Sequence, residues 1–92
     1  MIEAQLEMAR SYEKGEGVEK DAKQAVFWYR KAAEAGDADA QYNLGVCYET
    51  GNGVEKDAKQ AVFWYRKAAE AGNAAAQCNL GWCYKRGEGV EK

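Results

Sequence analysis

Small and apolar side chains recur at intervals of three and four residues in three stretches of the chain, which is the spacing of one helix face. The three stripes consist of Ala4, Met8, Ser11 and Tyr12, of Ala40, Leu44, Cys47 and Tyr48, and of Ala76, Leu80, Cys83 and Tyr84. Asp37 and Asn73 precede the second and third stretches, where N-cap residues belong. We therefore expect three similar helices, closed by Gly15, Gly51 and Gly87.

A second kind of helix is predicted between these stretches, at residues 22–35 and 58–71. Asp21 and Asp57 precede the two segments as N-caps, and a glycine follows each segment. Large aromatic side chains on such a helix are expected in the core. The positions expected to be buried are Ala25, Trp28, Tyr29, Ala32 and Ala33, with Ala61, Trp64, Tyr65, Ala68 and Ala69 in the later copy.

The chain contains an internal repeat, because residues 53–72 reproduce residues 17–36 letter for letter. A period of roughly 20 to 50 residues is typical of stacked supersecondary units, each of which buries its apolar face against the next. The predicted fold class is therefore all-α, an α-solenoid of antiparallel helix pairs with about two and a half 36-residue repeats and five helices. The expected single domain, residues 1–92, divides into units 1–36, 37–72 and an incomplete 73–92.

Two glycines, Gly45 and Gly81, fall in the middle of predicted helices. Glycine there costs about 1 kcal/mol relative to alanine. A close crossing of the paired helix would explain that cost, because a glycine leaves room for the neighbouring backbone. Trp28 and Trp64 are expected to fill the space that such small residues leave.

The composition is that of a globular protein, with 47% hydrophobic and 30% charged residues. The net charge of −2 argues against nucleic acid as a partner, since nucleic acid favours a basic face. No apolar run approaches the roughly 18 residues of a membrane span, and no signal peptide is visible at the start of the sequence. We therefore expect neither a nucleic acid nor a membrane as a partner.

The residue types needed for catalysis or metal binding are scarce. The chain has no histidine and no CxxC pair, so we expect no metal site and no cofactor. The absence of histidine also excludes Ser–His–Asp and Cys–His catalytic sets. The loops GEGVEK and GNGVEK join helix to helix and lack the GK[ST] sequence of a phosphate-binding loop. The chain is therefore predicted not to be an enzyme.

The three cysteines are expected to remain thiols. Cys47 and Cys83 share one repeat position, and equivalent helices of a stack lie about 9–10 Å apart. A disulfide needs Cα atoms within about 7 Å of each other. Cys78 and Cys83 lie five residues apart on one predicted helix and point to different sides. Reduced thiols indicate a reducing compartment, so the expected localisation is cytoplasmic.

The residues from Ala40 to Gly72 follow the pattern A-x-x-x-L-G-x-x-Y-x-x-G-x-G-V-x-x-D-x-x-x-A-x-x-W-Y-x-K-A-A-x-x-G. In this pattern the chain resembles the Sel-one-like repeat, a relative of the tetratricopeptide repeat with a slightly longer unit. The first unit departs from it at Met8 and Ala9, where Leu and Gly would be expected. Secreted cysteine-rich members of that family join neighbouring helices by cysteine pairs. The corresponding positions here are Ala33 with Ala40 and Ala69 with Ala76, which supports an intracellular, disulfide-free protein.

The resemblance implies a non-enzymatic adaptor module that binds a protein or peptide on the concave face formed by the first helix of each repeat. The first helices differ between units while the second helices are identical, as in a scaffold reused with a varied lining. Drift of a solvated surface would give the same pattern. The candidate partner-binding residues are Glu7, Arg10, Tyr42, Asn43, Val46, Glu49, Cys78, Asn79, Trp82 and Lys85.

Two kinds of candidate on this face each have a structural alternative. Asn43 and Asn79 could hydrogen-bond the backbone of an extended peptide, or instead bond a neighbouring helix or loop. Trp82 replaces Arg10 and Val46 of the other units and could anchor an interface. It could equally cover the core next to the last helix.

The alternative function is a self-associating, consensus-designed or truncated repeat scaffold without an external ligand. About three repeats are usually needed for a stable stack. The last predicted helix has no second helix after it, and exposed apolar surface of that kind is often covered by another chain. A homodimer would then form through Leu80, Trp82 and Tyr84.

Overall fold

The computed structural model describes residues 2–15 and 20–87, and it describes side chains from Gln5 onward within them. These residues form five helices of 13 residues each and no strand, which confirms the predicted all-α class. The helices are α1 (Ile2–Lys14), α2 (Ala22–Glu34), α3 (Ala38–Thr50), α4 (Ala58–Glu70) and α5 (Ala74–Arg86).

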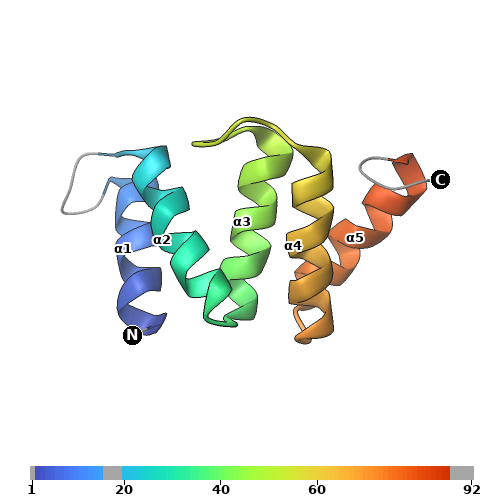
Figure 1. Cartoon of the computed structure of the whole chain (residues 1–92), viewed down its shortest axis with the longest axis horizontal. Coiled ribbons are helices and arrows are strands. Elements are labelled where there is room, and N and C mark those ends of the chain that lie inside the picture. The colour runs from blue at the N-terminus through green and yellow to red at the C-terminus, as the bar shows by residue number, and fades with distance from the viewer. Residues whose placement is uncertain (1, 16–19, 88–92) are drawn as a thin grey trace.

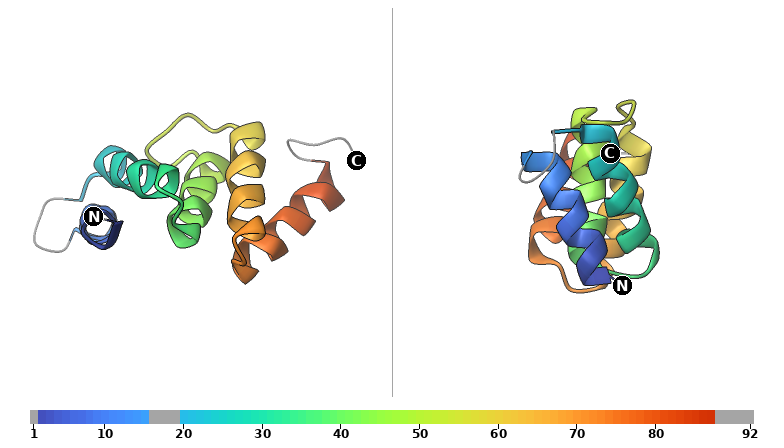
Figure 2. Two further views of the ribbon diagram at one scale, coloured as in Figure 1. Left: turned by 60° about the horizontal axis from the view of Figure 1, so that its bottom comes forward. Right: turned by 90° about the vertical axis from the view of Figure 1, so that its left-hand side faces the viewer.

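The helices follow one another in a row along the longest axis of the molecule, with consecutive helices running in opposite directions (Figure 1). Each helix packs mainly against the one before it and the one after it in the chain. The resulting body measures 42 × 24 × 16 Å. Seen from another side, α2 and α4 lie on one side of the row while α1 and α5 lie on the other (Figure 2). This is the arrangement of a helical repeat stack.

Capping residues start the helices where the sequence predicts. Asp57 accepts hydrogen bonds from the backbone N–H groups of Lys59 and Gln60, at 3.0 and 3.2 Å, and Asp21 caps α2 in the same way. Asp37 and Asn73 each accept one such bond at 2.8 Å, at the starts of α3 and α5. The second helices end one residue earlier than predicted, because their next residue, an alanine, is already the C-cap.

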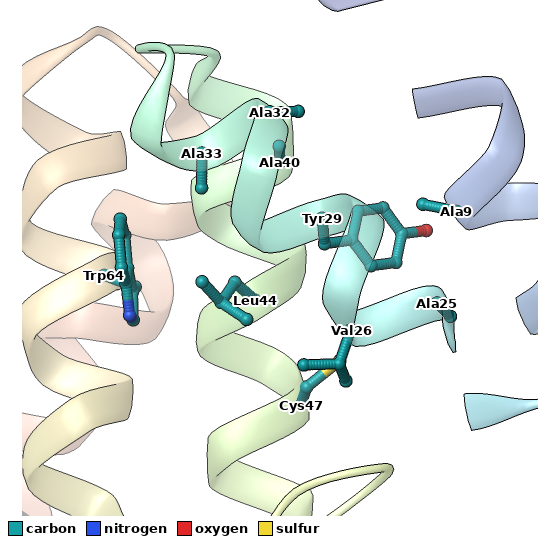
Figure 3. Packing of buried hydrophobic residues seen from close by; sticks show 10 residues of the cluster. All are labelled: Ala9, Ala25, Val26, Tyr29, Ala32, Ala33, Ala40, Leu44, Cys47 and Trp64. Carbon is teal, nitrogen blue, oxygen red and sulfur yellow. The ribbon is translucent and has the colours of Figure 1, made fainter. Parts of the chain in front are cut away.

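One core cluster joins the first three helices to α4 (Figure 3). The side chain of Leu44 on α3 is fully buried, and it lies between the residues of α2 and the indole of Trp64 on α4. Tyr29 is also buried and points from α2 toward Ala9 on α1. The cluster contains residues of α1 and α2 from the first repeat and of α3 and α4 from the second repeat. It therefore holds the two repeats together. A separate cluster around Tyr65 continues the core into α5.

The close crossing predicted at Gly45 is present. A Cβ atom on Gly45 would lie 2.7 Å from Cδ1 of Tyr65 and 3.3 Å from the backbone oxygen of Ala61. The ring that fills this space is therefore Tyr65, and the sequence-based choice of Trp64 was wrong. Trp64 instead packs into the cluster around Leu44. In the first unit the equivalent of Gly45 is Ala9, so the contact between α1 and α2 accommodates a methyl group.

The crossing predicted at Gly81 is absent from the described structure. A Cβ atom placed on Gly81 would meet no atom within 4 Å. Within the described ranges no helix follows α5, so nothing occupies the position that α4 takes against α3. Two glycines at equivalent repeat positions therefore lie in different surroundings.

Alanine at these two glycines is expected to have opposite effects. Gly81→Ala should raise the free energy of unfolding by up to about 1 kcal/mol, because alanine favours the helix and meets nothing. Gly45→Ala should lower it by about 1–2 kcal/mol. The added methyl group overpacks against the buried ring of Tyr65, and this destabilisation exceeds the gain from the higher helix propensity of alanine. Urea denaturation of both variants measures the two shifts, and shifts of the same sign would contradict the crossing.

Burial differs from the sequence prediction at a few other positions. Met8, predicted in the core stripe, is 37% exposed, because no helix precedes α1 among the described residues. Trp28 is only half-buried, whereas its copy Trp64 is buried, because the first lies near the end of the row. Val26 and Val62 are buried although the sequence did not single them out. Val26 lies against the segment that follows it, since a Cβ atom on Gly53 would come within 2.9 Å of its Cγ2, and Val62 packs in the cluster that includes Cys83 of α5.

Candidate functional site

The candidate binding residues all lie on α1, α3 and α5, the first helices of the repeats. They divide into two groups according to exposure. The half-buried group is Tyr42, Asn43, Val46, Glu49 and Asn79. The exposed group is Glu7, Arg10, Cys78, Trp82 and Lys85.

On α3, the half-buried candidates contact the neighbouring helices. The hydroxyl of Tyr65 on α4 donates a hydrogen bond of 2.6 Å to Oε1 of Glu49. The ring of Tyr42 lies against the same tyrosine, with 5.9 Å between ring centroids. The amide side chain of Asn79 on α5 acts on the same hydroxyl by lowering its pKa. Tyr65 therefore joins α3 to α4, and the cluster around it extends to α5.

Burial is the main cause that raises the pKa of Tyr65 well above its ordinary value. The hydrogen bond to Glu49 raises the pKa further, because a carboxylate opposes the phenolate, while Asn79 acts in the other direction. The same combination recurs one repeat earlier. There, burial and then Glu13 raise the pKa of Tyr29. Both tyrosines consequently stay neutral and act as hydrogen-bond donors inside the stack.

A second repeated contact crosses from each second helix to the following first helix. Arg30 donates a hydrogen bond to the hydroxyl of Tyr48, and Arg66 donates one of 2.6 Å to the hydroxyl of Tyr84. Sequence reasoning missed these pairs. The available signal was that both residues of each pair recur after 36 positions, so that any contact between them must recur as well.

The most exposed of the candidate aromatics is Trp82 on α5, which is 52% exposed. Nζ of Lys85 lies 5.2 Å from the centre of a Trp82 ring, and Cζ of Arg86 lies 5.3 Å from it. An open cavity of about 190 Å³ is lined by Cys78, Gly81, Trp82 and Lys85. This surface combines an aromatic face with positive charge, which suits a binding role better than catalysis.

The three residues expected to form a dimer contact differ in their exposure to solvent. Trp82 and Tyr84 are exposed, whereas Leu80 is half-buried against the cluster around Tyr65. The hydroxyl of Tyr84 already accepts the bond from Arg66. Trp82 is therefore the main apolar contribution that α5 could make to another chain.

A larger cavity of about 510 Å³ lies where α3 meets the loop before α4. Its lining is Tyr48, Val54, Glu55, Lys56, Asp57 and Gln60. The carboxylate of Asp57 already caps α4, so it is engaged in the fold. Across the described ranges, no three His, Cys, Asp or Glu side chains gather to hold a metal ion. No described helix has the length and apolar character to cross a membrane.

The cysteines are thiols in different surroundings, and alkylation should distinguish them. Burial raises the pKa of the Cys47 thiol to about 11, and the Glu13 carboxylate adds to the shift. Cys83 is buried as well, whereas Cys78 is exposed in the α5 cavity. At pH 8 iodoacetamide should modify Cys78 first, because thiolate is the reactive form and must be accessible.

Mass spectrometry of the timed reaction should show one fast adduct, with Cys47 reacting at least about tenfold more slowly. The control is Cys78→Ser, which should abolish the fast adduct. A fast adduct that persists in this variant would mean that Cys47 or Cys83 is accessible in solution.

Comparison with known proteins identifies close relatives of this arrangement. The family model described as the Sel1 repeat matches residues 2–37, 38–73 and 74–92. A Sel1 repeat protein from Oxalobacter formigenes is 48% identical, with a TM-score of 0.96, and the match covers 99% of this chain and 37% of that one. A protective antigen of uropathogenic Escherichia coli with an SLR fold is 46% identical at a TM-score of 0.96, over 98% of this chain and 19% of that one.

A more distant match is Helicobacter pylori cysteine rich protein B, 34% identical with a TM-score of 0.82, over 86% of this chain and 59% of that one. The chain thus spans less than two thirds of each of these proteins. No curated protein sequence matches it significantly.

Proposed function

Because the chain belongs to the Sel1 repeat family, we propose that it is a non-enzymatic module that binds a protein or peptide along its first helices. Proteins of this family are generally protein-interaction modules and typically non-catalytic scaffolds. The proposal further assigns the binding surface to the face formed by α1, α3 and α5. Such a stack presents an extended concave surface that suits a long ligand.

The observation that carries this assignment is the distribution of variation between repeats. Residues 17–36 and 53–72 are identical, so α2 and α4 present the same side chains. The first helices differ at exposed positions. Among the candidates, these are Glu7, Arg10, Cys78, Trp82 and Lys85. The second helices thus present constant side chains while the first helices vary, and this difference supports recognition of a partner through the first helices.

The test uses peptides selected from a displayed random library on the chain itself. The affinity of each selected peptide is measured for the unaltered chain and for the double variant Arg10→Ala with Trp82→Ala. Loss of these side chains from the binding face should weaken binding at least about tenfold, since aromatic and arginine side chains dominate interface energies. Circular dichroism should show unchanged helicity, because both residues are exposed.

The chain offers a matched control on the opposite helices. Phe27 and Phe63 are 49% and 47% exposed on α2 and α4, so Phe27→Ala with Phe63→Ala removes two aromatic rings of comparable exposure. Binding should survive this change. Peptides that bind the first double variant normally and lose affinity for the second would overturn the assignment of the face.

Self-association through α5 is the second candidate, and the exposure of Trp82 favours it. Two copies related by a two-fold axis would bring Lys85 and Arg86 of each copy together, which opposes the contact. Light scattering over a concentration series distinguishes the two cases. A constant mass of 10.2 kDa supports a free binding face, whereas a doubled mass that Trp82→Asp restores to monomer would support the dimer.

A further inference from the structure

Each of the two second helices, which lie on one side of the row, exposes a phenylalanine ring (Figure 2). Phe27 on α2 is 49% exposed, and Phe63 on α4 is 47% exposed. Phe27 has a later second helix next to it in the stack, whereas Phe63 has an earlier one. Because the two exposed fractions are nearly equal, neither an earlier nor a later second helix covers the ring. The exposure therefore recurs within the stack and is not a property of its last helix.

The phenylalanine lies at the centre of the outward face of its helix. An α-helix turns by about 100° per residue, so the buried side chains of Ala25 and Tyr29 lie on the side opposite Phe27. The exposed side chains of Lys23 and Lys31 lie within about 40° of the direction of the ring. Each second helix thus carries an outward stripe of lysine, phenylalanine and lysine. We call these the basic aromatic stripes; they consist of Lys23, Phe27 and Lys31 on α2 and of Lys59, Phe63 and Lys67 on α4.

Contacts within each stripe place charge and apolar surface together. The ring of Phe27 packs edge to face on Trp28, with 5.2 Å between ring centroids. Nζ of Lys31 lies 5.0 Å from the centre of the same ring. The equivalent distances on α4 are 5.0 and 5.2 Å. The two repeats therefore present the same combination of an ammonium group and an aromatic ring in the same arrangement.

Positive charge is concentrated on these two helices. Each carries three basic residues and one glutamate, so that the pair has a net charge of +4, although the whole chain has −2. The glutamates, Glu34 and Glu70, are the last residues of their helices and lie beyond the second lysine of each stripe. Complementary charge selects between competing partners. The stripes therefore favour an anionic partner.

The stripes are identical in the two repeats, whereas the exposed residues of the first helices differ. A protein partner presents different side chains along its length, so a face that recognises one is expected to vary from repeat to repeat. The headgroup layer of a lipid bilayer has the same chemistry everywhere and requires no such variation. The interface of a bilayer also accepts phenylalanine rings between lysines that meet the headgroups. A soluble polyanion would match the lysines but would offer no apolar region to the rings.

We propose that the basic aromatic stripes of α2 and α4 bind the surface of an anionic lipid bilayer, with the phenylalanine rings at the level of the headgroups and the lysines against anionic headgroups. The contact is peripheral and requires no membrane-spanning helix. The proposal departs from the sequence-based expectation of no membrane partner, which rested on the lack of a spanning segment. It goes beyond the proposed function, because the first helices stay free to bind a protein or peptide.

The test is co-sedimentation of the chain with lipid vesicles over a series of lipid concentrations. The vesicles contain phosphatidylserine and phosphatidylcholine in equal amounts. The chain should sediment with them at low salt, and vesicles of phosphatidylcholine alone should bind at least about tenfold more weakly. Raised salt should release the chain, because it screens the attraction between lysines and headgroups.

Two double variants locate the contact. Phe27→Ala with Phe63→Ala should raise the lipid concentration at half-binding at least about tenfold, because the rings no longer enter the interface. Lys23→Gln with Lys59→Gln should raise it roughly twenty-fivefold, since each lysine near an anionic surface strengthens binding about fivefold. Circular dichroism should show unchanged helicity for both variants, because all four side chains are exposed.

The matched control is Arg10→Ala with Trp82→Ala, which removes an exposed cation and an exposed ring from the first helices. Vesicle binding should be unchanged in this variant. Binding that is absent at low salt, that is equal without phosphatidylserine, or that survives the phenylalanine substitutions would overturn the inference.

Two soluble probes distinguish a bilayer from other anionic partners. The first is a single-stranded oligonucleotide and the second is polyglutamate, each carrying a fluorescent label. Neither should match the vesicles in a dependence on Phe27 and Phe63. If one of them binds through these rings while the vesicles do not, the stripes belong to a nucleic acid or to an acidic protein, and the inference is overturned. Peptide binding to the first helices is measured separately, so either proposal can fail without the other.

Discussion

Replacing Tyr65 with alanine is expected to lower the free energy of unfolding by about 3–5 kcal/mol, the cost of removing a large aromatic side chain from a core. The side chain is fully buried between α3 and α4, and its hydroxyl bonds to Glu49. Natural domains of this size unfold with only about 5–15 kcal/mol. The variant should therefore lose a large part of its stability, which urea denaturation followed by far-UV circular dichroism measures directly.

The control for this experiment is Tyr65→Phe, which keeps the ring over Gly45 and removes only the hydroxyl. The expected cost is about 1 kcal/mol, the typical net contribution of one hydrogen bond. A cost below about 1 kcal/mol for alanine would mean that Tyr65 does not hold the second repeat together. A cost as large for phenylalanine as for alanine would assign the stability to the Glu49 bond rather than to ring packing.

Replacing Leu44 with alanine is expected to cost about 3 kcal/mol, within the range measured for buried leucines. Leu44 is fully buried and lies between residues of α2 and Trp64 of α4. The cavity left behind would have walls from two different repeats, so partial collapse cannot fill it from one side. The same denaturation experiment gives the change in stability.

The matched control is Leu80→Ala, because Leu80 occupies the position of Leu44 in the next repeat. Leu80 is only half-buried, since no described helix follows α5. Its replacement should cost about 1 kcal/mol, in proportion to the apolar area that remains covered. Equal costs at the two positions would contradict the different surroundings of α3 and α5.

The helices and their order could be predicted from the sequence because the relevant signals are local and appear more than once. Asp57 and Asn73 cap helices by bonds to backbone groups within three residues. The stripe containing Leu44 recurs after 36 residues, and the repeat leaves stacking as the only way to bury it. Each signal was thus confirmed by its copy.

The identity of the ring at Gly45 could not be predicted in this way. Trp64 and Tyr65 are adjacent on α4, and both are buried. Which of them lies over Gly45 depends on the rotation of α4 about its axis, and this rotation is set by contacts with helices on both sides. Met8 was predicted to be buried because its repeat position is that of Leu44, but no described helix precedes α1 to cover it.

The candidate site could be predicted in its helices but not in its contacts. The contrast between Glu49 and Lys85 is visible in the sequence, whereas the bond from Tyr65 to Glu49 is not. That bond makes Glu49 part of the stack, whereas Lys85, the equivalent residue on α5, is exposed. Tertiary contacts thus give residues at equivalent positions different roles.

The central claim is that partners bind the first helices, and an NMR titration tests it most directly. A ¹⁵N-labelled sample of the chain is titrated with a library-selected peptide, and the backbone amide shifts are mapped onto the five helices. We expect the largest shifts on α1, α3 and α5, around Arg10 and Trp82, with α2 and α4 little changed. Shifts concentrated on α2 and α4, around Phe27 and Phe63, would contradict the claim.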